Sequence, residues 1–251
     1  MARSSADITA LLGAYDFICA YCGADVFEGE LFCKACLKGV KLNDGKTCLK
    51  CGTAIDGEQD YCSKCGKRIV FFDKAYSLYL FEGHVRKVIH RLKYAKERHF
   101  VPNLAKDMAN YIKEKKESFD CVTYVPMDGA SQRERGYNQS YLLAAALCDI
   151  LDKGAPQTLL TKVKATAKQE ELDFTQRLKN LQGAFKAVNK EIIKGKDILL
   201  IDDVLTTGAT ASFCAKALKG AGAKRVIVLT LASRKEIIST GVKDERTGRS
   251  K

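Results

Sequence analysis

The chain has 251 residues, of which 46% are hydrophobic, and its formal net charge is +12. This apolar fraction excludes a mostly disordered chain, and the length suffices for one large domain or two modest ones. No run of about 18 apolar residues occurs, so we expect no membrane-spanning helix. The first residues lack the positive cluster and apolar stretch of a secretory signal. We therefore expect a cytoplasmic protein, with peripheral contact at the inner membrane left open.

Charge and cysteine are unevenly distributed along the chain. Residues 1–70 hold nine basic and nine acidic side chains, whereas residues 71–251 hold 33 basic and 21 acidic ones. Eight of the eleven cysteines lie between positions 19 and 65. This break in composition predicts a small cysteine-rich module over 1–70, a basic body over 71–232 and a polar, basic tail over 233–251.

The cysteines of the module form four CxxC pairs, and the second two pairs repeat the first two after 29 positions: Cys19, Cys22, Cys33, Cys36, Cys48, Cys51, Cys62 and Cys65. Two CxxC turns supply the four thiolates that tetrahedral Zn²⁺ prefers, so the repeat predicts a double zinc ribbon with a structural role. Disulfides are the alternative, but CxxC pairs without a secretory signal favour metal. The pairing stays open: one zinc in each repeat, a cross-brace of alternating pairs, or a single occupied site.

The body alternates between strand and helix patterns. In chain order we predict a strand at 75–81, helices at 85–95 and 101–116, a strand at 119–126, a helix at 138–153, strands at 157–163 and 197–203, a helix at 209–222 and a strand at 225–232. Strands separated by helices imply right-handed βαβ units, and so an α/β fold with a mostly parallel sheet covered on both faces. Cys121, Cys148 and Cys214 lie in apolar segments and are expected in the core.

The segment 197–210 carries the most informative pattern. An apolar strand runs into Asp202 and Asp203, and a loop and a helix follow. Amides at a helix start can converge on a phosphate, and the loop residues suited to it are Thr206, Thr207, Gly208, Ala209 and Thr210. No GxxxxGK[ST] motif occurs, which argues against a P-loop NTPase. Two carboxylates beside a phosphate must hold vicinal hydroxyls or a metal ion. A ribose 5-phosphate satisfies that geometry, with its hydroxyls on the aspartates.

Residues 198–210 resemble the thirteen-residue signature of type I phosphoribosyltransferases, which bind 5-phosphoribosyl 1-diphosphate (PRPP). Four CxxC pairs, the segment 72–94, the RERGYNQ motif at 133–139 and this loop, in that order, resemble the ComF family. The resemblance implies a double zinc ribbon fused to a phosphoribosyltransferase-like domain, and a role in natural competence that involves single-stranded DNA. The sequence MDGA at 127–130 departs from the proline and basic residues expected there.

Transfer of a phosphoribosyl group would make the two aspartates the candidate catalytic pair, with Mg²⁺ and basic groups neutralising the leaving diphosphate. Arg133 and Arg135 follow the strand at 119–126 and are predicted to face the diphosphate, unless they form a solvated basic loop. Arg177 and Asn180 resemble part of a hood over the site, or alternatively a turn capped by asparagine. No residue indicates a base for a particular acceptor.

A basic segment spans residues 84–99 and contains one acidic residue, Glu97. Cationic side chains interleaved with aromatic rings are typical of a groove for single-stranded nucleic acid. The residues predicted to bind it are Arg86, Lys87, Arg91 and Lys93. A solvated helix face is the alternative. The three histidines also lie here, but their spacing argues against a metal site.

Two functions follow from these patterns. The first is a competence protein that binds a PRPP-type ligand and single-stranded DNA, and the second is an active phosphoribosyltransferase of nucleotide salvage with an unknown acceptor. An adhesive role of the zinc ribbons toward proteins of the competence machinery is compatible with both. The acceptor, the oligomeric state and the identity of any protein partner do not follow from the sequence.

Overall fold

A four-stranded parallel sheet forms the centre of the computed structural model, which describes residues 17–27, 29–67, 70–164 and 181–236. The strand order is β1-β6-β5-β2, and the strands are β1 (Lys74–Leu80), β2 (Cys121–Tyr124), β5 (Asp197–Leu205) and β6 (Arg225–Ser233). β5 and β6 lie in the middle of the sheet and are buried almost continuously. Such runs are typical of parallel strands covered on both faces. The predicted α/β class with a mostly parallel sheet is confirmed.

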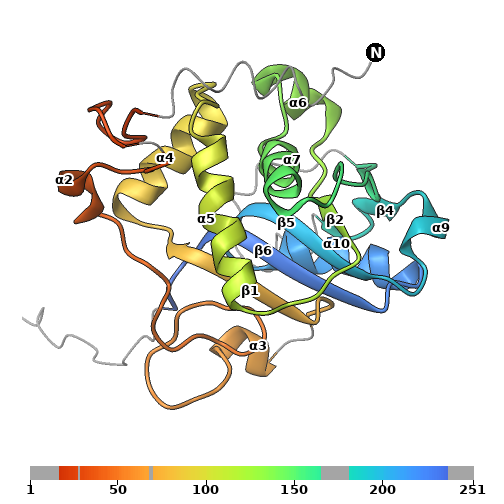
Figure 1. The fold of residues 1–251 in the computed structure, drawn as a ribbon. Coiled ribbons are helices and arrows are strands. Elements are labelled where there is room, and N and C mark those ends of the chain that lie inside the picture. The colour runs from red at the N-terminus through yellow and green to blue at the C-terminus, as the bar shows by residue number, and fades with distance from the viewer. Residues whose placement is uncertain (1–16, 28, 68–69, 165–180, 237–251) are drawn as a thin grey trace, which may run out of the picture.

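Helices cover both faces of this sheet (Figure 1). One face carries α4 (Gly83–Tyr94), α5 (Val101–Glu114) and α7 (Gln139–Leu151), and the other carries α10 (Ala209–Gly220). Alternate residues of the central strands enter the two cores: Leu199 and Ile201 face α5 and α7, while Ile198 and Leu200 face α10. The apolar stripe predicted on α4 is the side that is buried.

The short elements differ from the sequence-based prediction. The strand expected over 157–163 forms only at β3 (Leu160–Lys162), and it pairs antiparallel with β4 (Phe185–Ala187) in a separate two-stranded sheet. β3 and β4 pack over α10 rather than extend the parallel sheet. Within the described part of the body, the short helices α6 (Gly129–Arg135) and α9 (Lys190–Ile193) were not predicted. Asp128 begins α6 because its carboxylate accepts a hydrogen bond from the Ser131 amide.

The two cysteine repeats pack against different parts of the body. The first, with α2 (Lys34–Leu37), joins the core on the α4 side of the sheet. The second, with α3 (Ser63–Lys67), joins the core on the α10 side. Its Gly52 lies directly on β1: a Cβ atom there would stand 2.4 Å from the Ala75 carbonyl oxygen, and φ is +65°. Only glycine permits that approach.

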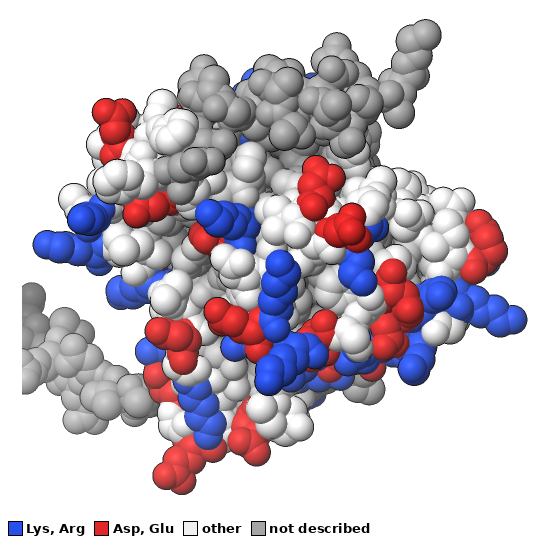
Figure 2. Space-filling model, viewed as in Figure 1, with Lys and Arg blue, Asp and Glu red and all other residues white. Residues whose placement is uncertain are grey.

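No helix among the described residues is both long and apolar enough to cross a bilayer. The face that carries α4, α5 and α7 shows basic and acidic side chains interspersed (Figure 2). The net positive charge is therefore not gathered into one large patch on this side of the molecule.

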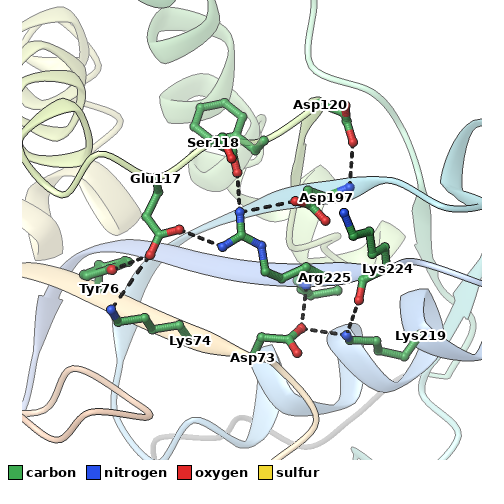
Figure 3. A network of polar contacts seen from close by, with 12 residues as sticks. Asp73, Lys74, Tyr76, Glu117, Ser118, Asp120, Asp197, Lys219, Lys224 and Arg225 are labelled. Carbon is green, nitrogen blue, oxygen red and sulfur yellow. Dashed lines mark hydrogen bonds and ion pairs between the residues drawn. The ribbon is translucent and has the colours of Figure 1, made fainter.

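A polar network ties together the amino ends of the strands (Figure 3). Arg225, the first residue of β6, donates to the Glu117 carboxylate at 2.9 Å and to the Ser118 carbonyl at 2.6 Å. The Tyr76 hydroxyl donates to the same glutamate at 2.6 Å, and Arg225 also pairs with Asp197 at the start of β5. These contacts fix the sheet at the edge opposite the carboxyl ends of its strands, where ligands bind in such folds.

Candidate functional site

The predicted phosphate loop is a tight turn at the carboxyl end of β5. The strand ends at Leu205 and α10 begins at Ala209. Gly208, at the N-cap of α10, has a φ of 73°, a conformation that glycine adopts without strain. Residue 202 and residues 204–211 line a shallow hollow of about 10 Å³ that is open to solvent. The turn residues 206–208 are half-buried, so the loop is accessible to a ligand at the positive end of the helix.

The two aspartates stand directly before this turn, and both are buried. Asp202 Oδ1 accepts hydrogen bonds from the Ser140 hydroxyl and the Asp203 amide, each at 3.0 Å. Asp203 Oδ1 accepts one from the Val204 amide at 2.8 Å. Burial, and then the adjacent charge of Asp203, raise the pKa of Asp202 to about 7. A carboxylate in this setting gains from neutral hydrogen-bond donors such as sugar hydroxyls.

Lys93 occupies a different place from the one predicted for it. Its ammonium group lies 2.8 Å from Asp203 Oδ2, and its side chain is 18% exposed. The assignment of Lys93 to an exposed nucleic-acid surface is therefore corrected, because the fold turns this lysine toward the acid pair. Burial alone would lower the pKa of Lys93, but the charge of Asp203 outweighs it and the pKa is raised. Nothing in the local sequence distinguishes Lys93 from its basic neighbours.

Ser140 is a second residue of the site that sequence analysis missed. It lies in the first turn of α7, whose N-cap Asn138 accepts hydrogen bonds from the amides of Ser140 and Tyr141. This cap orients the helix so that the Ser140 hydroxyl reaches Asp202. The capping pattern predicts where the helix starts, but the contact joins residues 62 positions apart, so only the fold brings them together.

Arg133 and Arg135, which were predicted to face the diphosphate, lie on α6, the helix that follows β2. Because β2 is the neighbour of β5 in the sheet, α6 starts from the same edge as the phosphate loop. Arg135 donates to the Gln139 side chain at 2.6 Å, and its guanidinium lies 5.1 Å from the centre of the Tyr94 ring. Arg133 is exposed. Their role toward a diphosphate stays a prediction. The hood residues Arg177 and Asn180, and the tail beyond 236, lie outside the described residues.

Arg91 connects α4 to the first cysteine repeat. Its guanidinium forms a two-pronged ion pair with Glu97 and also donates to the carbonyls of Ala20 and Tyr21, at 2.5 and 3.2 Å. This geometry satisfies the planar donors of the guanidinium within the protein. The contacts therefore indicate that Arg91 docks the first ribbon on α4. They do not leave its guanidinium facing solvent, as a contact with a nucleic-acid phosphate would require.

Two of the four predicted nucleic-acid residues remain on the surface. Arg86 and Lys87 are exposed on α4, and Lys87 also donates to the Tyr21 hydroxyl at 3.0 Å. Farther along the same helix, the Tyr94 ring is 50% exposed and lies 4.6 Å from the ring of His90. Cations and an exposed ring are thus still present together on α4, though with fewer free cations than predicted.

The eight cysteines form two clusters, and each cluster comes from one repeat. Within each, all Sγ atoms lie within 4.8 Å of one another: Cys19, Cys22, Cys33 and Cys36 in the first, Cys48, Cys51, Cys62 and Cys65 in the second. The Sγ separations of 3.8 Å (Cys22–Cys33) and 3.6 Å (Cys51–Cys62) match the roughly 3.8 Å edge of a tetrahedron with Zn–S bonds of about 2.3 Å. All eleven cysteines lie in the described ranges, and none of them forms a disulfide there. The geometry favours one zinc in each repeat over a cross-brace.

The other three cysteines pack as expected. Cys148 and Cys214 are fully buried and Cys121 is half-buried. Burial raises the pKa of Cys148 to about 12, so its thiol stays protonated.

A cavity of about 410 Å³ lies between the second repeat and the phosphate loop, and residues 205–209 form part of its wall. Val70, Phe72 and Leu205 contribute apolar walls, and Lys64 and Lys67 of α3 also line it. The ring of Phe72 lies 3.8 Å from the position of a Cβ atom on Gly208. The second ribbon is thus part of the surroundings of the loop, which the linear order of the two modules did not predict.

Comparisons with known proteins agree with this architecture. Residues 11–70 match the family described as double zinc ribbon domain, and residues 138–246 match the phosphoribosyl transferase domain. Competence protein F of Haemophilus influenzae is 27% identical over 229 residues, which cover 88% of this chain and 99% of that protein. DNA utilization protein YhgH of Salmonella typhi is 26% identical over 204 residues, 79% and 88% of the two chains. Competence protein ComFC of Bacillus subtilis is 25% identical over 224 residues, 82% and 90% of the two chains.

This chain is a ComF-type homologue. Its double zinc ribbon precedes its phosphoribosyltransferase domain, as the motif order predicted. Among solved structures, glutamine PRPP amidotransferase from B. subtilis matches with a TM-score of 0.35 and 23% identity, over 52% of this chain and 25% of that one. The matched part of this chain thus covers a quarter of the length of that enzyme.

Proposed function

We propose that this ComF-type protein binds a 5-phosphoribosyl ligand of the PRPP type at the β5–α10 turn and acts on single-stranded DNA in the cytoplasm. One observation carries the first part: a buried pair of aspartates stands directly before a solvent-facing Thr/Gly turn at the start of a helix. The names of the relatives, competence protein and DNA utilization protein, support the second part.

The turn and the acid pair suit the two ends of a ribose 5-phosphate. Backbone amides at residues 206–210 and the positive end of α10 favour a phosphate, and the threonine hydroxyls add donors. Asp202 and Asp203 offer acceptors to the ribose hydroxyls. In PRPP the 1-diphosphate adds negative charge, and we expect it to be bound together with Mg²⁺.

Calorimetric titration tests this binding. Ribose 5-phosphate and PRPP with Mg²⁺ should bind to the zinc-loaded protein more tightly than inorganic phosphate does, because only the sugar reaches the acid pair. Asp203→Ala should remove most of this difference and leave the affinity for inorganic phosphate within about twofold. Equal affinities of the wild type for all three ligands, or no binding of any, would contradict a phosphoribosyl site.

The surface of α4 that includes Arg86 and Lys87 is the proposed contact for single-stranded DNA. Phosphate contacts of this kind release counterions, so affinity should fall steeply with salt concentration. Arg86→Glu should weaken binding of an oligonucleotide, whereas Lys113→Glu on α5 provides a control with the same change of charge on an exposed residue. Binding that does not depend on salt, or an equal effect of both substitutions, would contradict this assignment.

Phosphoribosyl transfer to an unidentified acceptor is the second candidate function. The adjacency of β2 and β5 favours it, since α6 with Arg133 and Arg135 then starts beside the sugar site, on the side where a diphosphate would leave. Release of diphosphate from PRPP in the presence of a base, abolished by Asp203→Ala, would establish transfer. Binding of PRPP without turnover on any common nucleobase would favour a role as a binding protein.

A further inference from the structure

Lys93 is the only cation for which the described residues show an ion pair with the acid pair. Its Nζ atom lies 2.8 Å from Asp203 Oδ2, with side-chain exposures of 18% and 6%. The preceding residue, Leu92, is fully buried in the core between α4 and the sheet, so α4 is held in the register that turns Lys93 toward β5. A charge removed from water to this extent requires a partner, and here the partner is a residue of the proposed sugar site.

We propose that Lys93 is a positioning residue of the sugar site, which holds the Asp203 carboxylate in place and offsets its charge so that the acid pair can accept the hydroxyls of a ribose 5-phosphate. This inference rests on the phosphoribosyl function proposed above. It explains how the site can hold two adjacent carboxylates beside a phosphate. The sequence pattern shows these acids but assigns no cation to them.

The contacts of Asp203 leave an acceptor position for a sugar hydroxyl. Oδ1 accepts one hydrogen bond, from the Val204 amide, and Oδ2 faces Lys93. Each carboxylate oxygen has two acceptor positions, so Oδ1 can accept a further hydrogen bond while the lysine stays on Oδ2, which is buried. The lysine therefore does not have to leave when a hydroxyl binds.

Charge balance gives Lys93 a second role. Asp202 and Asp203 place two like charges side by side in one small, buried region, where their mutual repulsion is poorly screened. A single ammonium at 2.8 Å from the acid pair reduces that repulsion, and its position next to Asp203 adds no contact to the phosphate loop itself. We therefore expect Lys93 to matter for ligands that carry the sugar and little for inorganic phosphate.

The pH dependence of binding provides a readout that a merely structural lysine would not change. The groups that face Asp202 are Asp203 on β5, Lys93 on α4, Ser140 on α7 and Cys214 on α10. Burial and Asp203 raise the pKa of Asp202 to about 7, and Lys93 opposes that rise. Removal of the ammonium should raise this pKa further, so binding of ribose 5-phosphate should be lost at a higher pH on acidification.

The test compares Lys93→Met, Lys93→Arg and the control Lys113→Met, each as the full-length, zinc-loaded chain. Lys113 is exposed near the end of α5, so its loss removes the same charge from a distant surface. The ligands are ribose 5-phosphate and inorganic phosphate, titrated between pH 5.5 and 8.5. We expect Lys93→Met to weaken ribose 5-phosphate about tenfold at pH 7, the factor that corresponds to one pKa unit, with inorganic phosphate within twofold.

The conservative variant and the two ligands separate the possible failures. Lys93→Arg keeps the charge and should bind the sugar phosphate better than Lys93→Met does, and Lys113→Met should match the wild type. Unchanged or tighter binding of ribose 5-phosphate by Lys93→Met would overturn the inference. An equal loss of both ligands would overturn it too, because the lysine would then support the loop or the fold. A wild type that binds neither ligand would refute the phosphoribosyl function itself.

Discussion

Gly208 offers the sharpest test of the phosphate loop. Its φ of 73° lies in the left-handed region, and a Cβ atom there would meet the Phe72 ring no closer than 3.8 Å, an ordinary contact. Alanine would therefore fit the space, and the cost of Gly208→Ala is the backbone conformation alone, about 1 kcal/mol for an L-residue. Because the turn is half-buried, it can relax in the absence of a ligand, and a bound phosphate must then restore the strained conformation.

A cost of about 1 kcal/mol in binding corresponds to an affinity about fivefold weaker. Gly195→Ala is the matched control: Gly195 has the same φ of 73°, a Cβ atom there would have no neighbour within 4 Å, and it lies in the turn before β5, at the other end of that strand. Calorimetry with inorganic phosphate should show weaker binding for Gly208→Ala only, and urea unfolding should show a loss of stability of up to about 1 kcal/mol for Gly195→Ala.

Equal affinity of both glycine variants and the wild type for phosphate would refute the reasoning. The amides of the turn would then not need the positive φ of Gly208 to bind an anion. Weaker binding by both variants would also contradict it, because the effect would come from general destabilisation and not from the loop.

Three further outcomes follow from the contacts described above. Elemental analysis should find two zinc ions per chain, and Cys33→Ser and Cys62→Ser should each lose one; loss of both ions from either variant would contradict two independent sites. Arg91→Met removes two hydrogen bonds to the first ribbon and an ion pair that is about one-third exposed, so we expect this ribbon to be destabilised by about 1 kcal/mol and to transfer zinc faster to a chromogenic chelator. Transfer at the wild-type rate would contradict a docking role. The raised pKa of Asp202 means that the folded protein binds a proton more tightly than the unfolded chain, so this residue costs stability as the pH rises from about 4 to about 7. The free energy of unfolding of Asp202→Asn should therefore increase relative to that of the wild type as the pH rises through this window. Urea unfolding at pH 5 and pH 8 measures this difference. A difference that does not change with pH would contradict the raised pKa of Asp202.

Local patterns were sufficient for the class of fold and for the elements that carry the two candidate sites. The CxxC repeat, the strand–turn–helix at 197–210 and the apolar stripe of α4 each involve residues close together in the chain, and their periodicity or spacing reflects backbone geometry directly. For the same reason the main strands and helices are found close to where they were predicted. The short α6 was missed because seven residues with no buried side chain leave no periodic pattern.

Contacts between distant segments were decided by the tertiary structure alone. Lys93 and Asp203 are 110 positions apart, and the sequence gives Lys93 the same appearance as Arg86 and Lys87, so its turn toward the acid pair depends on how α4 packs on the sheet. Equally, an arrangement with one cluster per repeat and an antiparallel pairing of β3 with β4 depends on which surfaces meet in three dimensions. Sequence spacing identifies the groups that can perform chemistry, whereas packing of the apolar core determines which of them stand within hydrogen-bonding distance.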